Sequence, residues 1–210
     1  MDISVIFQII ILIFSVIIHE ISHGFVALCF GDKTAQYEGR LTLNPVKHLD
    51  WFGSVILPLV LFLTHAGFMI GWAKPVPYNP YNLKNRNIAE PLISLAGPVS
   101  NLLVATIFGL MIRGISYFGL ISSAPMTNLI NIFGFVVLIN ISLAVFNLLP
   151  IPPLDGSKIF FAFLPLKAKY IFQDLSEKYG LFLILIIVMF LPNFISPIIF
   201  YLFKLITGLN

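Results

Sequence analysis

Two histidines and a glutamate lie close together in the first apolar stretch of the chain. His19, Glu20 and His23 form the pattern His-Glu-x-x-His inside residues 3–30, where Glu20 is the only charged residue. On an α-helix, residues four apart differ in direction by about 40°, so both imidazoles face the same side and can bind one metal ion. The adjacent carboxylate can then activate water as a general base. These residue types at this spacing predict a zinc hydrolase site.

The apolar surroundings of the motif strengthen this interpretation. Imidazole and carboxylate groups are costly in hydrocarbon when unpaired, so ionisable residues within a membrane segment usually serve a function. The run 3–30 is long enough to cross a bilayer. It is also too long for the core of a signal peptide and does not start with basic residues, so we expect it to be retained.

The composition of the whole chain is typical of a membrane protein. Of its 210 residues, 59% are hydrophobic and 10% are charged, and the mean hydropathy is +0.99. These values exclude an ordinary soluble domain. One cysteine excludes an internal disulfide, and no cluster of basic and aromatic residues suggests a nucleic-acid partner. We expect an all-α polytopic membrane protein embedded in the lipid bilayer, with residues 1–210 forming a single integral membrane domain.

The apolar residues fall into five stretches, at about 3–30, 52–70, 92–112, 128–149 and 180–207. Lysine and arginine concentrate in 31–50, 71–91 and 150–180, and cytoplasmic loops carry an excess of these residues. All three basic segments lie inside, with the N-terminus outside, if 52–70 enters and leaves the membrane on one side. A straight transmembrane helix over 52–70 is the alternative. The last stretch is either one kinked helix or two half-helices, because Pro192 and Pro197 interrupt it.

A second group of polar residues follows the fourth apolar stretch. Asn147 is followed by Pro150, Pro152 and Pro153, and then by Asp155 and Gly156. The prolines must end the helix and form an irregular turn at membrane depth. A carboxylate is costly there, and the predicted topology brings it to the same side of the membrane as the histidine motif. Asp155 is therefore predicted as the third zinc ligand, which leaves one position for water. A simple turn residue is the alternative.

Together these segments resemble the site-2 protease family of intramembrane zinc metalloproteases, peptidase family M50. The resemblance covers residues 15 to about 160 and rests on His19-Glu20-x-x-His23, on Ala96-Gly97-Pro98-Val99-Ser100-Asn101, and on Asn147-x-x-Pro150-x-x-x-Leu154-Asp155-Gly156. No stretch is long and polar enough for a PDZ domain, so the chain is most similar to the compact, PDZ-less prokaryotic branch.

The resemblance implies a specific site and substrate class. A core of three transmembrane helices would hold one zinc ion per chain through His19, His23 and Asp155, and Glu20 would activate water. Asn147 would position the substrate or stabilise the tetrahedral intermediate. The substrates would be transmembrane segments of proteins or signal-peptide remnants, cut near the cytoplasmic face of a prokaryotic plasma membrane.

The sequence also leads to predictions for other polar residues. Gly97 and Asn101 are spaced to face one neighbouring helix, so Asn101 is expected to make an interhelical hydrogen bond, with a contact to the metal site as the alternative. His48 and His65 are expected to form hydrogen bonds rather than to bind metal.

The segment 35–44 alternates apolar and polar residues, which predicts a β-strand or short hairpin. Its edge could pair with an extended substrate, or it could simply pack on the core. For the chain as a whole, a metal or proton carrier using the same His, Glu and Asp residues is the alternative function, although no internal repeat supports it.

Overall fold

The computed structural model describes residues 3–56, 60, 63–64, 73–119, 124–165, 168, 171–172, 178–180 and 192–209. Among these residues, the three longest helices are α1 (Ile3–Cys29), α4 (Arg86–Tyr117) and α5 (Ala124–Asn147). Each contains a segment long and apolar enough to cross a membrane. The shorter elements are α2 (Thr34–Tyr37), η1 (Pro45–His48), η2 (Trp51–Ile56), η3 (Pro80–Asn82), α6 (Asp155–Ala162) and α8 (Pro192–Thr207). The expected all-α architecture is confirmed.

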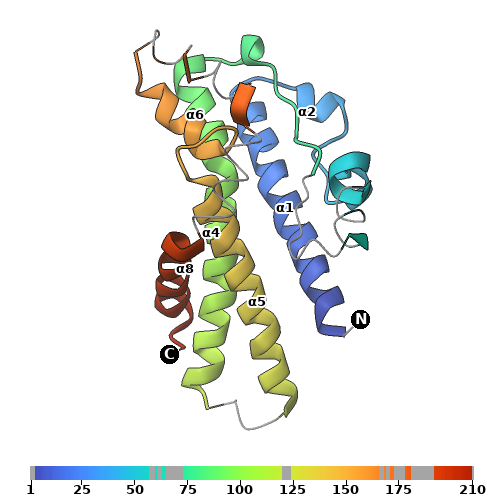
Figure 1. The fold of residues 1–210 in the computed structure, drawn as a ribbon, viewed down its shortest axis with the longest axis vertical. Coiled ribbons are helices and arrows are strands. Elements are labelled where there is room, and N and C mark those ends of the chain that lie inside the picture. Colours follow the sequence, from blue (N-terminus) through green and yellow to red (C-terminus); the bar gives the residue numbers. More distant parts are fainter. Residues whose placement is uncertain are drawn as a thin grey trace.

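The long helices form a bundle in which α4 packs along both α1 and α5 (Figure 1). α1 and α5 run towards the end of the molecule that carries α2 and α6, and α4 runs in the opposite direction. The shorter helix α8 packs against α4 and α5. The His motif of α1 and the start of α6 therefore approach the same end of the bundle, as the sequence predicts.

α4 is longer than the apolar run 92–112 at both ends. Its first turn holds an ion pair between Arg86 and Glu90, which are four residues apart in sequence. Arg86 Nε lies 2.7 Å from Glu90 Oε1. Such pairs support a helix at positions where hydropathy gives no signal. At the other end, Arg113 continues the helix and donates to the carbonyls of Leu205 and Ile206 at the end of α8. The polar residues at both ends thus extend the helix beyond the hydrocarbon-facing part.

Small and branched residues fill the interface of α4, α5 and α8. Ala105 and Ile112 of α4 pack against Val137 and Ile141 of α5, and all four are buried. Gly109 allows α8 to come close, because a Cβ there would lie 2.2 Å from Ile206 Cγ2. Close approach at small residues is the usual way in which membrane helices gain packing energy.

The prediction of a strand over 35–44 is wrong. No strand occurs among the described residues, and Thr34–Tyr37 form helix α2. Two local features account for the difference. The Asp32 carboxylate accepts hydrogen bonds from the backbone N–H and the hydroxyl of Thr34, which stabilises the first turn of α2. Gly39 then has a φ of +61°, which breaks any extended run. Alternation over ten residues does not outweigh these two signals.

Asp32 also ties α1 to the segment before α4. Its carboxylate accepts from the backbone N–H of Asn79 at 2.7 Å and from Asn82 Nδ2 at 2.9 Å. Burial opposes ionisation of this carboxyl group, but the hydrogen bonds from Thr34, Asn82 and Asn79 outweigh it and lower the pKa of Asp32.

Two of the sequence-based expectations fall largely outside the described residues. Within 52–70, the structure describes residues 52–56, which belong to η2, and residues 60 and 63–64. The re-entrant path and the role of His65 are therefore not tested. Of the final apolar stretch, α8 is described and residues 181–191 are not.

Candidate metal centre

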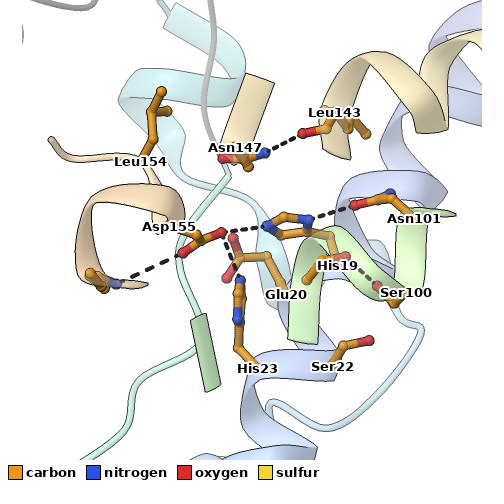
Figure 2. A network of polar contacts seen from close by, with 12 residues as sticks. His19, Glu20, Ser22, His23, Ser100, Asn101, Leu143, Asn147, Leu154 and Asp155 are labelled. Atoms are coloured by element: carbon orange, nitrogen blue, oxygen red, sulfur yellow. Dashed lines mark hydrogen bonds and ion pairs between the residues drawn. The ribbon is translucent and has the colours of Figure 1, made fainter. Parts of the chain in front are cut away.

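The three predicted ligands come together at one point, although Asp155 is more than a hundred residues from the histidines in sequence. His19 Nε2 lies 3.0 Å and His23 Nε2 lies 3.2 Å from the same oxygen, Oδ2 of Asp155 (Figure 2). One possible ligand atom from each of the three residues lies within 4.8 Å of the others. All three side chains are largely shielded by the bundle.

The opposite nitrogen of each ring fixes the position of its hydrogen. His23 Nδ1 lies 2.6 Å from the carbonyl oxygen of Ile93, and a carbonyl can only accept, so Nδ1 carries the hydrogen. His19 Nδ1 lies 2.6 Å from Oδ1 of Asn101, which is likewise an acceptor. In the neutral rings, both Nε2 atoms then carry a lone pair directed towards Asp155. Such outer hydrogen bonds are typical of metal-binding histidines.

The donor set therefore fits a divalent cation. Without a metal ion, hydrogens on the two Nε2 atoms pair them with Asp155 Oδ2. A bound cation would take the place of these hydrogens, and the same two nitrogens and carboxylate oxygen would then be its ligands. Two imidazoles and one carboxylate are a common ligand set for catalytic zinc, which keeps a fourth position open.

Gly97 of α4 makes room for this arrangement. A Cβ at this position would lie 2.5 Å from His19 Nε2 and 2.6 Å from His23 Nε2. The neighbouring Pro98 cannot donate to the carbonyl of Ser94, so α4 lacks one helical hydrogen bond beside the site. The Gly-Pro pair thus brings the backbone of α4 directly against both metal-facing nitrogens.

Asp155 reaches the site because the chain reverses tightly after α5. Asp155 is the first residue of α6, directly after the proline-rich turn. Gly156 packs so closely on the end of α5 that a Cβ would lie 2.2 Å from the carbonyl oxygen of Leu148. The second carboxylate oxygen of Asp155, Oδ1, lies 4.0 Å from Nζ of the half-exposed Lys158. This contact leaves Oδ2 directed towards the histidines.

Glu20 points towards the same space from α1 (Figure 2). Its Oε2 accepts a hydrogen bond of 2.9 Å from the backbone N–H of Val76. Residues 73–79 follow an irregular, extended path past the site, and the buried Arg40 holds them by donating to the carbonyls of Lys74 and Pro75. The Val76 contact was not foreseen from the sequence, since a backbone donor leaves no residue-type signal.

Asn147 lies at the C-terminal end of α5, beside the cluster rather than within it. Its Nδ2 donates to the carbonyl of Leu143 at 2.9 Å, one turn back on the same helix (Figure 2). His48 is buried and its Nε2 lies 2.8 Å from the carbonyl of Thr42, in agreement with the hydrogen-bonding role expected for it.

Asn101 makes both contacts that the sequence left as alternatives. It accepts from His19, and it also bonds across the interface to Asn140 of α5. Asn140 and Ser15 were not predicted from the sequence. An asparagine in the middle of the apolar stretch 128–149 was the signal that could have indicated the first of them.

Comparison with known proteins agrees with this geometry. The family model described as Peptidase family M50 matches residues 7–191. The chain belongs to this family. As a member of M50, it is a hydrolase of the metalloprotease type, and its three long apolar helices make it an integral membrane protein.

The sequence of this M50 peptidase is also similar to those of individual proteins. YwhC of Bacillus subtilis (strain 168), named as a candidate zinc metalloprotease, is 40% identical over 195 residues, or 91% of the chain and 81% of YwhC. Rip2 of Mycolicibacterium smegmatis carries the same description and is 35% identical over 143 residues, or 68% of the chain and 51% of Rip2. A similarly named protein of Methanocaldococcus jannaschii is 32% identical over 143 residues, or 68% of the chain and 63% of that protein. No solved structure matches the chain at a significant level.

Proposed function

We propose that this M50 peptidase hydrolyses peptide bonds in transmembrane segments of membrane proteins or in signal-peptide remnants. His19, His23 and Asp155 would hold one zinc ion, and Glu20 would act as the general base. The observation that carries the proposal is the convergence of three possible metal-ligand atoms at one point inside a bundle of membrane-length helices. The carrier alternative lacks such support, since the chain belongs to a peptidase family.

The residues around the site have separate tasks in this mechanism. Zinc held there supplies Lewis-acid polarisation and makes water a better nucleophile near neutral pH. Glu20 takes the proton of the attacking water and passes it to the leaving amine. The Val76 N–H holds one carboxylate oxygen of Glu20, which leaves Oε1 to handle the proton. We assign to Asn147 the binding of the substrate backbone or of the developing negative charge, because it lies at the end of α5 beside the cluster.

The position of the site supports a membrane substrate. The ligand histidines lie on a helix whose large apolar side chains, among them Phe7, Ile10 and Phe14, face outwards as they would towards lipid. A transmembrane substrate shields its own peptide bonds by helical hydrogen bonds, so the cleaved part must unwind before hydrolysis. The basic segments around the site favour a location towards the cytoplasmic face, with the N-terminus outside.

A zinc and cleavage assay separates the proposed roles. The full-length protein in proteoliposomes is supplied with a single-pass model substrate, and zinc content is measured in parallel. Glu20→Gln should abolish cleavage and keep zinc, because it removes the base and no ligand. Asp155→Ala should lose both, because it removes one of three protein ligands.

The exposed carboxylate Glu38 provides the matched control, since Glu38→Gln should change neither cleavage nor zinc. Cleavage that persists in Glu20→Gln would remove Glu20 from the mechanism. Full zinc occupancy in Asp155→Ala would require a different third ligand.

A further inference from the structure

A row of buried polar groups crosses the centre of the bundle, from the ligand His19 on α1 to α5. Ser15 lies one turn before His19 on α1, Asn101 lies on α4 and Asn140 lies on α5. Both asparagines are 0% exposed. Buried amides in an apolar interior are costly unless each polar atom is paired, so the pairing pattern is informative.

Two backbone carbonyls fix the orientation of both amides. Asn140 Nδ2 lies 2.8 Å from the carbonyl oxygen of Val136 and 2.9 Å from Ser15 Oγ. Asn101 Nδ2 lies 3.3 Å from the carbonyl oxygen of Ser15. Carbonyls only accept, so each asparagine must direct its NH2 group towards them. Asn140 Oδ1 is then left to accept the second hydrogen of Asn101 Nδ2, over 2.8 Å.

The orientation of Asn101 determines which group His19 Nδ1 meets at the metal centre. With its NH2 group bound on two sides, Asn101 must present Oδ1 to His19 Nδ1, at 2.6 Å. An acceptor at this place keeps the ring hydrogen on Nδ1 and leaves the Nε2 lone pair for the metal. A flipped Asn101 would present NH2 to Nδ1 and move the hydrogen to Nε2. The flip would also place Oδ1 against two acceptors, Asn140 Oδ1 and the Ser15 carbonyl.

We infer that Asn140 is a positioning residue for the metal centre, because it locks Asn101 in the orientation that keeps the hydrogen of His19 on Nδ1. The inference rests on the proposed function in taking His19 as a zinc ligand. We call this chain of hydrogen bonds the Ser15–Asn140–Asn101 relay. His23 does not depend on the relay, since the Ile93 carbonyl holds its Nδ1 directly. The two histidines should therefore respond differently when the relay is broken.

Histidine ¹⁵N NMR of the full-length protein in nanodiscs, before and after zinc removal with a chelator, tests this difference. In the wild-type protein both histidines should carry the hydrogen on Nδ1. Asn140→Leu should give a mixture of tautomers at His19 and leave His23 unchanged. Ser142→Ala is the matched control, because Ser142 lies on the same helix and its hydroxyl donates to the Leu138 carbonyl of that helix, outside the relay. An equal change at both histidines, or none at His19, would overturn the inference.

Zinc affinity, measured by chelator competition, provides a second test. Asn101→Leu should weaken zinc binding by about 10- to 100-fold, and Asn140→Leu by about tenfold. Because Asn140 acts through Asn101, the double variant should bind zinc no more weakly than Asn101→Leu alone. Additive losses would show that Asn140 acts independently of Asn101 and would contradict the relay.

These outcomes are separable from the proposed function and from misfolding. A wild-type protein that shows the expected tautomers but cleaves no transmembrane substrate contradicts the proposed function and leaves the relay intact. A wild-type protein that cleaves, with His19 unaffected by Asn140→Leu, contradicts only the relay. If Asn140→Leu prevents folding, Asn140→Ala removes the same amide without added bulk and is subject to the same two measurements.

Discussion

Gly97 is the residue of α4 that lies directly against the metal-facing nitrogens. The space it leaves is smaller than a methyl group, since a Cβ would approach Nε2 of His19 and His23 to 2.5 and 2.6 Å. A glycine in the interior of a helix normally costs stability relative to alanine. At this position the cost is offset by the room that the rings of His19 and His23 need.

Gly97→Ala should therefore weaken zinc binding while the helix remains folded. The methyl group must displace both rings from their positions, so we expect a loss of about tenfold or more, comparable to the loss of an outer-shell partner. Chelator competition measures the effect. Gly114→Ala on the same helix is the control, because nothing lies within 4 Å of its added Cβ. Equal zinc affinity in both variants would show that the histidines can move aside without cost.

At the scale of secondary-structure elements, the reversal between α5 and α6 is what brings Asp155 to the histidines. The turn depends on close contact between Gly156, in the first turn of α6, and the carbonyls of Leu148 and Leu149 just after α5. These backbone atoms cannot rotate away from an added methyl group as a side chain can. A substitution in this contact should therefore shift the whole of α6.

Gly156→Ala should destabilise the protein by about 1–3 kcal/mol, the usual cost of overpacking, and should also reduce zinc content. Thermal unfolding in detergent and metal analysis measure the two effects. Gly134→Ala in α5 is the matched control, since its Cβ would make only an ordinary contact of 3.9 Å with Phe203. It should keep or slightly raise stability, because alanine favours helix over glycine. If Gly156→Ala retains zinc and stability, the turn must be able to open without displacing Asp155.

The Asp32 carboxylate is one of the links between α1, α2 and the segment before α4. Its folded-state pKa is lowered below the usual value near 3.8. A depressed pKa means that the ionised group stabilises the folded state above its unfolded pKa, and that this contribution is lost as the pH falls through the folded pKa. Stability should thus decrease below about pH 4 in part because Asp32 becomes protonated.

Asp32→Asn should lower stability at neutral pH and reduce the dependence of stability on pH in the acidic range, because the amide does not titrate there. Melting temperatures of wild type and variant between neutral pH and pH 3 give the comparison. Glu38→Gln, at an exposed position, should follow the wild-type curve. Parallel curves for Asp32→Asn and wild type would mean that another group causes the acidic loss.

At the scale of the whole molecule, the arrangement of the long helices sets the depth and the side of the site. α1 and α5 run in the same direction, so His23 and Asp155 reach the same end of the bundle. The end of α4 and the start of α5 lie at the other end. The basic segments and the site should therefore lie on one side of the membrane and the end of α4 on the other.

Cysteine labelling in intact cells tests this orientation. On a Cys29→Ser background, which removes the exposed native cysteine, Lys84→Cys should be protected from an impermeant reagent applied outside. Phe118→Cys, just after α4 at a position 73% exposed, should be labelled. Labelling of both after permeabilisation serves as the control. External labelling at position 84 with protection at position 118 would reverse the proposed topology.

The sequence by itself determined which residues, His19, His23 and Asp155, were candidates for one site, and that the chain is an α-helical membrane protein. The His-Glu-x-x-His spacing needs only helical geometry to bring two imidazoles together, and length and hydropathy are sufficient to indicate a membrane helix. Asp155 could be predicted only together with the histidine motif, because a carboxylate after three prolines is by itself typical of a turn that ends a helix. None of these inferences requires knowledge of how the helices are rotated.

Only the tertiary structure decided which faces of the helices meet. In water, a polar stripe shows which side of a helix is exposed, but a membrane helix is apolar towards lipid and towards its neighbours alike, so its sequence does not show its packed face. The contact of Gly97 with both histidines, the Ser15–Asn140–Asn101 relay and the Val76 hydrogen bond to Glu20 all depend on that choice. The same holds for segment 35–44, where Asp32 and Gly39 set a helical turn that alternation alone could not reveal.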